Sequence, residues 1–262
     1  MTTDPKSSFE SSEFSKEHNP PPPAYNTATD IAASACSEET LQTQIDTLRV
    51  NPEKFPLSHL SASQSPVLVP GYATSHETTL HVRVYNKAQR RVTAKDGQGS
   101  EFFNVEGPAP FSSLSWRRKV FDTAKGNAHV FDFHHHGMRL ASWKAEVAGR
   151  EAASFEFVKL WSLSFKDMAI KGTVHHQQGG GSGSEDVELV MRPMDKFGEY
   201  TSIMAADGAV LGIIIRRLDE RLMELSEWDV RIAPGADMCL MMAFTLLRAQ
   251  LSRGWRSTYF GA

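Results

Sequence analysis

The stretch that decides the fold reads Asp237-Met-Cys-Leu-Met-Met-Ala-Phe-Thr-Leu-Leu-Arg-Ala-Gln-Leu251. Between Met238 and Leu247 the only polar residue is Thr245, so a helix formed here has no polar face. A helix that is apolar all round has to be enclosed by protein or by lipid. Crossing a bilayer takes about 20 apolar residues, and Arg248 and Gln250 interrupt this run earlier. The stretch therefore predicts a buried core helix.

Residues at both ends of this stretch are typical of helix boundaries. Pro234-Gly235 breaks the preceding segment, and Asp237 can cap the first turn, where a carboxylate also favours the positive end of the helix dipole. Gly254 predicts the C-terminal stop. Because nearly everything between Leu80 and Ile232 resembles β-strand, we expect a β-sheet curled around the helix.

Short strands joined by tight turns are predicted for the middle of the chain. Residues 80–85 alternate apolar and polar side chains, as in a half-buried strand. Asx-Gly and Gly-Asn pairs indicate hairpins, and they occur at Asp96-Gly97, Gly126-Asn127 and Asp207-Gly208. Further strands are predicted at 91–94, 101–105, 116–122, 129–133, 140–147, 155–161, 168–174, 187–191, 200–204, 210–215 and 222–232. About twelve strands with one apolar helix predict a mainly β protein, a closed antiparallel barrel around a central C-terminal helix, because closure removes exposed strand edges.

The first 60 residues differ from the rest in composition. Residues 1–60 carry a net charge of −5, whereas residues 61–262 carry +2. Residues 1–35 are rich in Ser, Thr, Glu, Asn and Pro without periodicity, which predicts a disordered tail. A short helix is predicted at 37–49, capped by Ser37. The barrel domain is then predicted to span residues 61–262.

The tail contains a motif that indicates a partner. The run Asn19-Pro-Pro-Pro-Pro-Ala-Tyr25 favours a polyproline II rod, which docks into aromatic grooves at low entropic cost. Within it, Pro22, Pro23 and Tyr25 match the P-P-x-Y pattern that WW domains read. A WW-domain protein, with ubiquitin ligases of that class among the candidates, is therefore a predicted partner. A plain proline-rich spacer is the alternative.

The region from the hairpins to the helix resembles the LURP-one-related proteins of the Tubby C-terminal-like superfamily. The resemblance rests mainly on Asp229-Val-Arg-Ile-Ala-Pro-Gly-Ala-Asp237 leading into the apolar helix, and it covers residues 67–255. Trp116-Arg117-Arg118 and the Asp207-Gly208 turn fit the same pattern. The resemblance implies a twelve-stranded barrel threaded by a helix, and a non-enzymatic protein. Tubby relatives bind phosphoinositides through basic surface residues, and phospholipid scramblases share the fold and often a P-P-x-Y tail.

Two basic groups are candidates for contact with anionic phospholipids such as phosphoinositides. They are Arg117 with Lys119, which share one face of a strand, and Arg216, Arg217 and Arg221. Each cation near an anionic membrane contributes about 1 kcal/mol, whereas ordinary solvated strand charge is the alternative. The predicted function is a non-enzymatic binding or adaptor module in the cytoplasm, peripheral at membranes where lipid is bound. Scramblase-like lipid transport, although the acidic calcium-binding segment of scramblases is missing, and a purely structural interaction domain are the alternatives.

No catalytic, metal or cofactor site is predicted. Histidines cluster at His134-His-His136 and His175-His176, but two imidazoles on one strand face do not complete a site that needs three or four ligands. Neither a nucleophile elbow nor a P-loop occurs. A barrel domain with a net charge of +2 does not indicate nucleic-acid binding. With Cys36 and Cys239 as its two cysteines and no signal segment, the chain is expected in a reducing compartment. No transmembrane span is predicted.

Overall fold

The structure is a computed structural model of the chain. It describes residues 43, 46, 47, 50, 51, 54–61, 65–85, 90–107, 117–135, 142–157, 169–175, 186–195, 198–220 and 225–259. Of the helix predicted at 37–49, only residues 43, 46 and 47 are described, and all three are helical. The motif residues Pro22, Pro23 and Tyr25 lie outside the described residues, as does Arg221.

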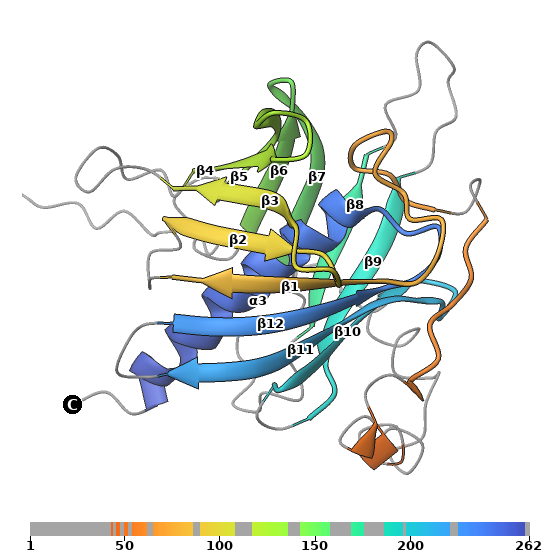
Figure 1. The fold of residues 1–262 in the computed structure, drawn as a ribbon. Helices are drawn as coiled ribbons and strands as arrows, with labels where there is room; N and C mark the ends of the chain where they lie inside the picture. Colours follow the sequence, from red (N-terminus) through yellow and green to blue (C-terminus); the bar gives the residue numbers. More distant parts are fainter. Residues whose placement is uncertain are drawn as a thin grey trace, which may run out of the picture.

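The described chain forms one closed barrel of twelve antiparallel strands, which confirms the predicted fold. Each strand pairs with its neighbours in sequence, and β12 closes the barrel against β1 (Figure 1). The strands are β1 (Thr78–Val84), β2 (Arg91–Lys95), β3 (Glu101–Glu106), β4 (Arg118–Asp122), β5 (Ala128–His135), β6 (Ser142–Val147), β7 (Arg150–Phe157), β8 (Ile170–Val174), β9 (Val187–Pro193), β10 (Tyr200–Ala205), β11 (Val210–Glu220) and β12 (Leu225–Ile232).

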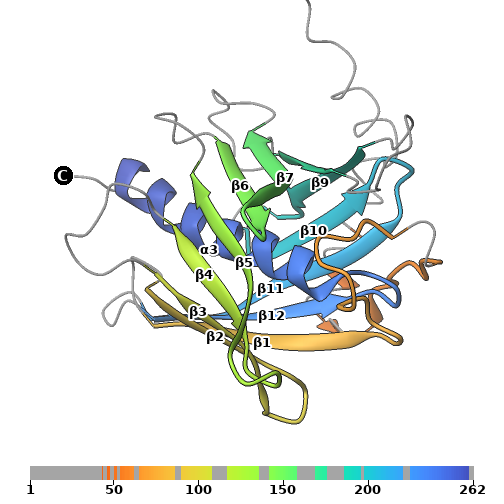
Figure 2. The same ribbon diagram turned by 90° about the horizontal axis from the view of Figure 1, so that it is seen from above.

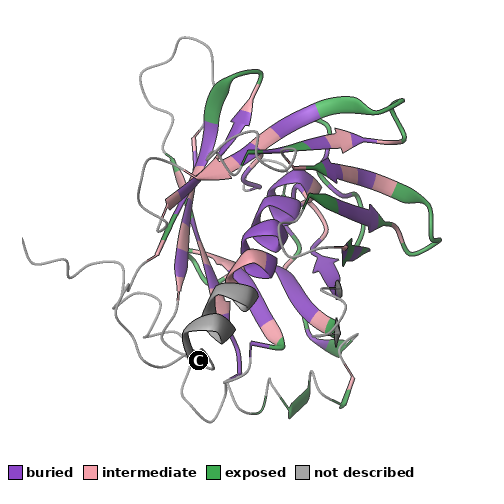
Figure 3. Cartoon of the chain, turned by 90° about the vertical axis from the view of Figure 1, so that its left-hand side faces the viewer, coloured by how far each residue is buried: buried purple, intermediate pink, exposed green. Residues whose placement is uncertain are grey.

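The helix α3 (Met238–Tyr259) lies inside this barrel, as the apolar stretch predicted (Figure 2). All side chains from Cys239 to Ala249 are buried. Figure 3 shows the buried residues along α3 and the strands, with exposed residues gathered at the hairpin ends. Within the core, Phe244 packs edge-to-face against Phe155, with 5.1 Å between the ring centroids. The strands therefore provide the apolar surroundings that the helix requires.

Two glycines let α3 approach the sheet closely. A Cβ atom added to Gly172 in β8 would lie 2.7 Å from Cζ of Phe244, and one added to Gly212 in β11 would lie 2.8 Å from Sδ of Met241. Carbon atoms normally approach to about 3.5–4.0 Å. A larger residue at either glycine would therefore displace side chains of the helix, so helix and sheet fit each other at defined positions.

Asp237 joins the start of α3 to the barrel. Its Oδ1 accepts hydrogen bonds from the backbone N–H groups of Cys239 (2.7 Å) and Leu240 (3.3 Å), which confirms the predicted cap. Its Oδ2 accepts from the N–H groups of Leu68 (2.7 Å) and Val69 (2.9 Å). Burial raises the pKa of this carboxyl, and the four hydrogen bonds act against that rise. Asp237 therefore also links the segment before β1 to the start of the helix.

The helix ends later than predicted. α3 continues through Gly254 to Tyr259, so the predicted stop at Gly254 is wrong. A glycine inside a helix costs only about 1 kcal/mol relative to alanine, and no proline follows it in the sequence. A single glycine is therefore a weak stop signal in a helix that is already held in place by its buried part.

Residues before β1 pack onto the barrel. Phe55 is buried in a small cluster with Ile213 and Ile215 of β11, separate from the main core. Leu60 belongs to the main core and donates its backbone N–H to the carbonyl of Pro234 (3.0 Å). Residues 54–60 are thus attached to the barrel, and the division of the chain into 1–60 and 61–262 stays a prediction.

Candidate functional site

A pocket of about 410 Å³ lies on the outer face of β1, β12 and β11. β12 is the middle strand, and its register places Asp229 between His81 on β1 and Ile215 on β11. Two residues further along β12, Arg231 lies opposite Thr79 of β1. The lining residues are Glu77, Thr79, His81, Ile215, Arg217, Asp229 and Arg231. The pocket therefore brings together the first strand of the barrel and its last two strands.

Asp229 organises one side of this pocket. Its Oδ1 accepts a hydrogen bond from Nδ1 of His81 (2.6 Å), and its Oδ2 accepts one from Nε of Arg217. The Asp229 side chain is 11% exposed, whereas those of His81 and Arg217 are each 51% exposed. Because an ionised carboxylate only accepts hydrogen bonds, Nδ1 of His81 carries a proton. The buried carboxylate thus holds an imidazole and a guanidinium side by side at the pocket.

Arg231 lies at the other side of the pocket. Its side chain is 6% exposed and pairs with Glu77, whose Oε1 accepts from Nε at 2.9 Å. The NH2 nitrogen of Arg231 also donates to the backbone carbonyl of Phe55 (3.1 Å). A buried guanidinium needs such partners because an unpaired buried charge is strongly destabilising. The segment around Phe55 is therefore held against the pocket by this arginine.

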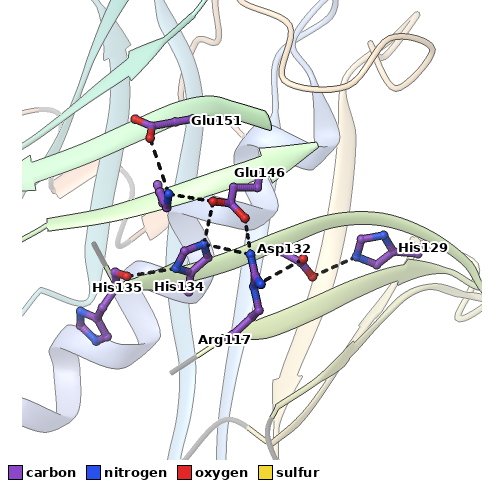
Figure 4. A network of polar contacts seen from close by, with 8 residues as sticks. Arg117, His129, Asp132, His134, His135, Glu146 and Glu151 are labelled. Atoms are coloured by element: carbon purple, nitrogen blue, oxygen red, sulfur yellow. Dashed lines mark hydrogen bonds and ion pairs between the residues drawn. The ribbon is translucent and has the colours of Figure 1, made fainter. Parts of the chain in front are cut away.

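A second polar cluster crosses the outer face of β4, β5, β6 and β7 (Figure 4). At its centre Glu146 accepts hydrogen bonds from Lys144 Nζ (2.7 Å) and Arg117, and lies 3.2 Å from His134 Nε2. Burial by itself raises the pKa of Glu146, but Lys144 and His134 outweigh it and hold the pKa below its usual value. Arg117 also lies 3.5 Å from Asp132. The charges of this cluster compensate one another, so it ties four strands together.

The histidines do not converge on a metal. His134 faces the outer cluster, whereas the ring of His135 lies inside, 4.9 Å from the Trp143 ring centroid and with Nε2 2.8 Å from Nε2 of Gln250. His136 and His176 lie outside the described residues. Within the part of the chain that the structure describes, no three His, Cys, Asp or Glu side chains are placed to hold one metal ion.

We expect His135 to make the stability of the protein depend on pH. Burial, followed by the nearby charge of Arg118, lowers the pKa of His135 from 6.5 to about 4. Between these pH values the unfolded chain binds a proton that the folded chain does not bind, so stability present above pH 6.5 is lost as the pH falls toward about 4. In urea titrations at a series of pH values, His135→Gln should lose less stability over this interval than the wild type. An exposed-site variant, His76→Gln, should follow the wild type, and equal pH slopes for all three proteins would contradict the assignment.

The predicted lipid-binding residues do not lie in one patch. Arg117, directly before β4, and Lys119, in β4, are both exposed on the outer side of the barrel. Arg216 instead lies over the core residue Trp228, with 5.7 Å between its guanidinium carbon and the ring centroid, while Arg217 points outward to Asp229. Four strands separate β4 from β11 along the shorter way round the barrel. The two predicted groups are thus separate features.

A basic and aromatic cluster at the end of β1 was missed by sequence reasoning. The guanidinium carbons of Arg83 and Arg91 lie 5.3 Å and 4.9 Å from the ring centroid of Tyr85. Both distances fall within the range of cation–π attraction, about 6 Å. Both arginines are exposed, and Nε of Arg83 is 3.3 Å from Glu227. The strand alternation that turns Arg83 and Tyr85 outward was the available signal, but the register of β1 against β2 that brings Arg91 beside them was not predicted.

These features define the class of protein: a barrel of twelve antiparallel strands built around a buried C-terminal helix, with its polar clusters on the outer surface. The sequence profile of the LURP-one-related family matches residues 78–248, and the chain belongs to that family. The match runs from β1 into the buried part of α3 and confirms the resemblance seen in the sequence.

Comparison with solved structures finds an X-ray structure of a protein from Arabidopsis thaliana. It shares 13% sequence identity with this chain and gives a TM-score of 0.46, with 72% of this chain and 100% of that one covered. No curated protein has a significant match to the sequence.

Proposed function

We propose that this protein is a non-enzymatic adaptor whose barrel contacts anionic phospholipids and whose tail recruits a WW-domain partner. The barrel face that supports lipid contact runs over β1, β2 and β4, and the P-P-x-Y motif precedes the barrel in the sequence. Such a protein would bring its partner to the cytoplasmic surface of a membrane. The LURP-one-related family, to which the chain belongs, is compatible with a binding role.

The observation that carries the lipid part is the pairing of Arg83 and Arg91 with Tyr85. An aromatic ring beside cations suits the boundary between lipid headgroups and acyl chains. The exposed cations of this face are Arg83, Arg91, Lys95, Arg117 and Lys119, of which Arg83 and Arg117 are paired with carboxylates. At about 1 kcal/mol for each cation close to an anionic surface, a few of them suffice for reversible binding. Glu106 lies between Arg91 and Lys119 in register and reduces the total.

The tail part rests on Pro22, Pro23 and Tyr25. Adjacent prolines favour the extended rod that aromatic grooves recognise, and the tyrosine fills a neighbouring pocket. WW domains, including those of ubiquitin ligases, are the class of partner with this specificity. Recruitment through a short motif leaves the barrel free to contact the membrane.

One experiment with the full chain tests both parts. Vesicles containing phosphoinositides are expected to sediment the wild type together with an added WW domain. Arg83→Ala/Arg91→Ala should lose most of the sedimentation, because two exposed cations are removed, and Tyr25→Ala should sediment without the WW domain. The matched control is Lys171→Ala/Arg192→Ala, which removes two cations from β8 and β9. Equal sedimentation of the two double variants, or WW binding by Tyr25→Ala, would contradict the respective part.

The same vesicles separate this proposal from lipid scrambling. In the described chain, no helix is both long and apolar enough to cross a bilayer, and α3 is enclosed by the strands that surround it. We therefore expect no transfer of fluorescent lipid between leaflets. Rapid transfer on adding the protein would favour the scramblase alternative, and the absence of both sedimentation and transfer would favour a purely structural domain.

A further inference from the structure

We infer that the pocket between β1, β12 and β11 binds a phosphate monoester, and that Arg217, His81 and Thr79 are the residues that hold it. This inference does not depend on lipid contact by the face over β1, β2 and β4. The pocket shares only β1 with that face and uses other residues, with Arg83 outside its lining.

Polar atoms in this pocket are left unused by the protein. Arg217 bonds to Asp229 through Nε, and its two terminal nitrogens have no hydrogen-bond partner among the described residues. The same holds for Nε2 of His81, whose Nδ1 is taken by Asp229, and for the hydroxyl of Thr79. A guanidinium presents its terminal nitrogens as a planar fork that matches two oxygens of a phosphate. The threonine hydroxyl can donate to a third oxygen.

The imidazole suits a phosphate monoester in particular. A monoester loses its second proton near pH 6, so near neutral pH it occurs both with and without a P–OH hydrogen. With Nδ1 bound to Asp229, Nε2 of His81 can accept a hydrogen bond from the P–OH group of a singly charged monoester, and an imidazole that carries both protons can donate to a doubly charged one. The same side chain therefore bonds to the ligand in both of its charge states.

The carboxylates of the pocket do not oppose this ligand as strongly as their number suggests. Both oxygens of Asp229 are engaged, by His81 and Arg217. Oε1 of Glu77 is engaged by Arg231. The two acidic and two basic side chains cancel in formal charge, while the Arg217 side chain remains 51% exposed. An incoming phosphate thus meets available donors at a site without net negative charge.

The size and lining of the pocket fit the rest of the ester. A volume of about 410 Å³ lies within the range of small-molecule sites. Ile215 forms an apolar part of the wall and is continuous with the cluster around Phe55. The phosphate source is either a soluble ester or the headgroup of a lipid such as phosphatidic acid, since both present the same chemical group.

The test uses the full chain and two probes at physiological salt. Glycerol 3-phosphate, the soluble probe, is titrated while the imidazole resonance of His81 is followed by NMR, and phosphatidic acid vesicles are used for sedimentation. Arg217→Gln is expected to raise the dissociation constant of whichever probe binds by about tenfold or more, because two charge-assisted hydrogen bonds are lost. His81→Gln is the second variant and should weaken it as well, so the test does not rest on one substitution.

Lys171→Gln is the matched control. Lys171 lies on β8, away from the pocket, and its side chain is 33% exposed and paired with Glu188, much as Arg217 is paired with an aspartate. Its substitution should leave glycerol 3-phosphate binding unchanged. A response to the soluble probe assigns a soluble ester. A response to vesicles alone, lost in Arg217→Gln but retained in Lys171→Gln, assigns the lipid headgroup. Binding of neither probe, or equal binding by wild type and both pocket variants, overturns the inference.

Discussion

Replacing Phe244 with alanine is expected to lower the free energy of unfolding by about 3–5 kcal/mol, the usual cost of removing a buried aromatic ring. Phe244 is fully buried in α3, where its ring packs against Phe155 and lies close to Gly172. The helix is enclosed by strands, so little can collapse into the cavity left behind. Equilibrium unfolding in urea, followed by intrinsic fluorescence, measures the change.

The control for this prediction is another phenylalanine in a strand. Phe121 in β4 is only partly buried and packs against His129 at the surface, with 5.6 Å between the ring centroids. Phe121→Ala should therefore cost less than half as much as Phe244→Ala. A loss of under about 1 kcal/mol for Phe244→Ala would mean that the ring is not enclosed.

Asp237→Ala is expected to destabilise the protein by about 3 kcal/mol or more. The substitution leaves the buried N–H groups of Cys239, Leu240 and Leu68 and the partly buried N–H group of Val69 without their acceptor. Each loss of a buried acceptor costs about 1–3 kcal/mol, although the costs are not additive. Thermal unfolding, together with hydrogen exchange at Leu68 and Val69, measures the effect.

Asp237→Asn tests whether both carboxylate oxygens of Asp237 are needed or whether the residue serves only as a helix cap. An asparagine side chain has one acceptor oxygen, so it can serve the helix or the segment before β1, but not both. Because one set of hydrogen bonds is kept, we expect this variant to lose about half as much stability as Asp237→Ala if both sets of bonds matter. Stability within about 0.5 kcal/mol of the wild type, near the error of such measurements, would show that Asp237 acts as an ordinary surface cap.

The fold was predictable because its decisive signals are local. Ten consecutive residues with one polar side chain allow only a buried helix. The alternation of apolar and polar residues over 80–85 identifies the face of the strand that packs against this helix. Turns with Gly126-Asn127 or Gly208 adopt the left-handed backbone that such residues favour. The turn at Ala148-Gly149 was not predicted, because alanine rarely adopts the φ of 50° found there.

The pocket could not be predicted because its residues are distant in sequence. His81 and Asp229 are 148 residues apart and meet only because the last strand closes the barrel against the first. Taken alone, each of these residues is typical of a solvent-exposed polar position on the outer side of a strand. For Arg216 and Arg217, strand alternation already implies opposite faces, and the structure places them so. Local pattern thus determines which way a side chain points, but the register of distant strands determines its neighbours.

The central claim is that the strands enclose α3 in direct contact, and a double-mutant cycle between Gly172 and Phe244 tests it. Gly172→Ala alone should cost about 1–3 kcal/mol, because the added methyl group overlaps the Phe244 ring. In the Phe244→Leu background the same alanine should cost less, giving a favourable coupling of about 1 kcal/mol or more. Costs that add within about 0.5 kcal/mol would show that β8 and α3 do not touch, and would contradict the account of the fold.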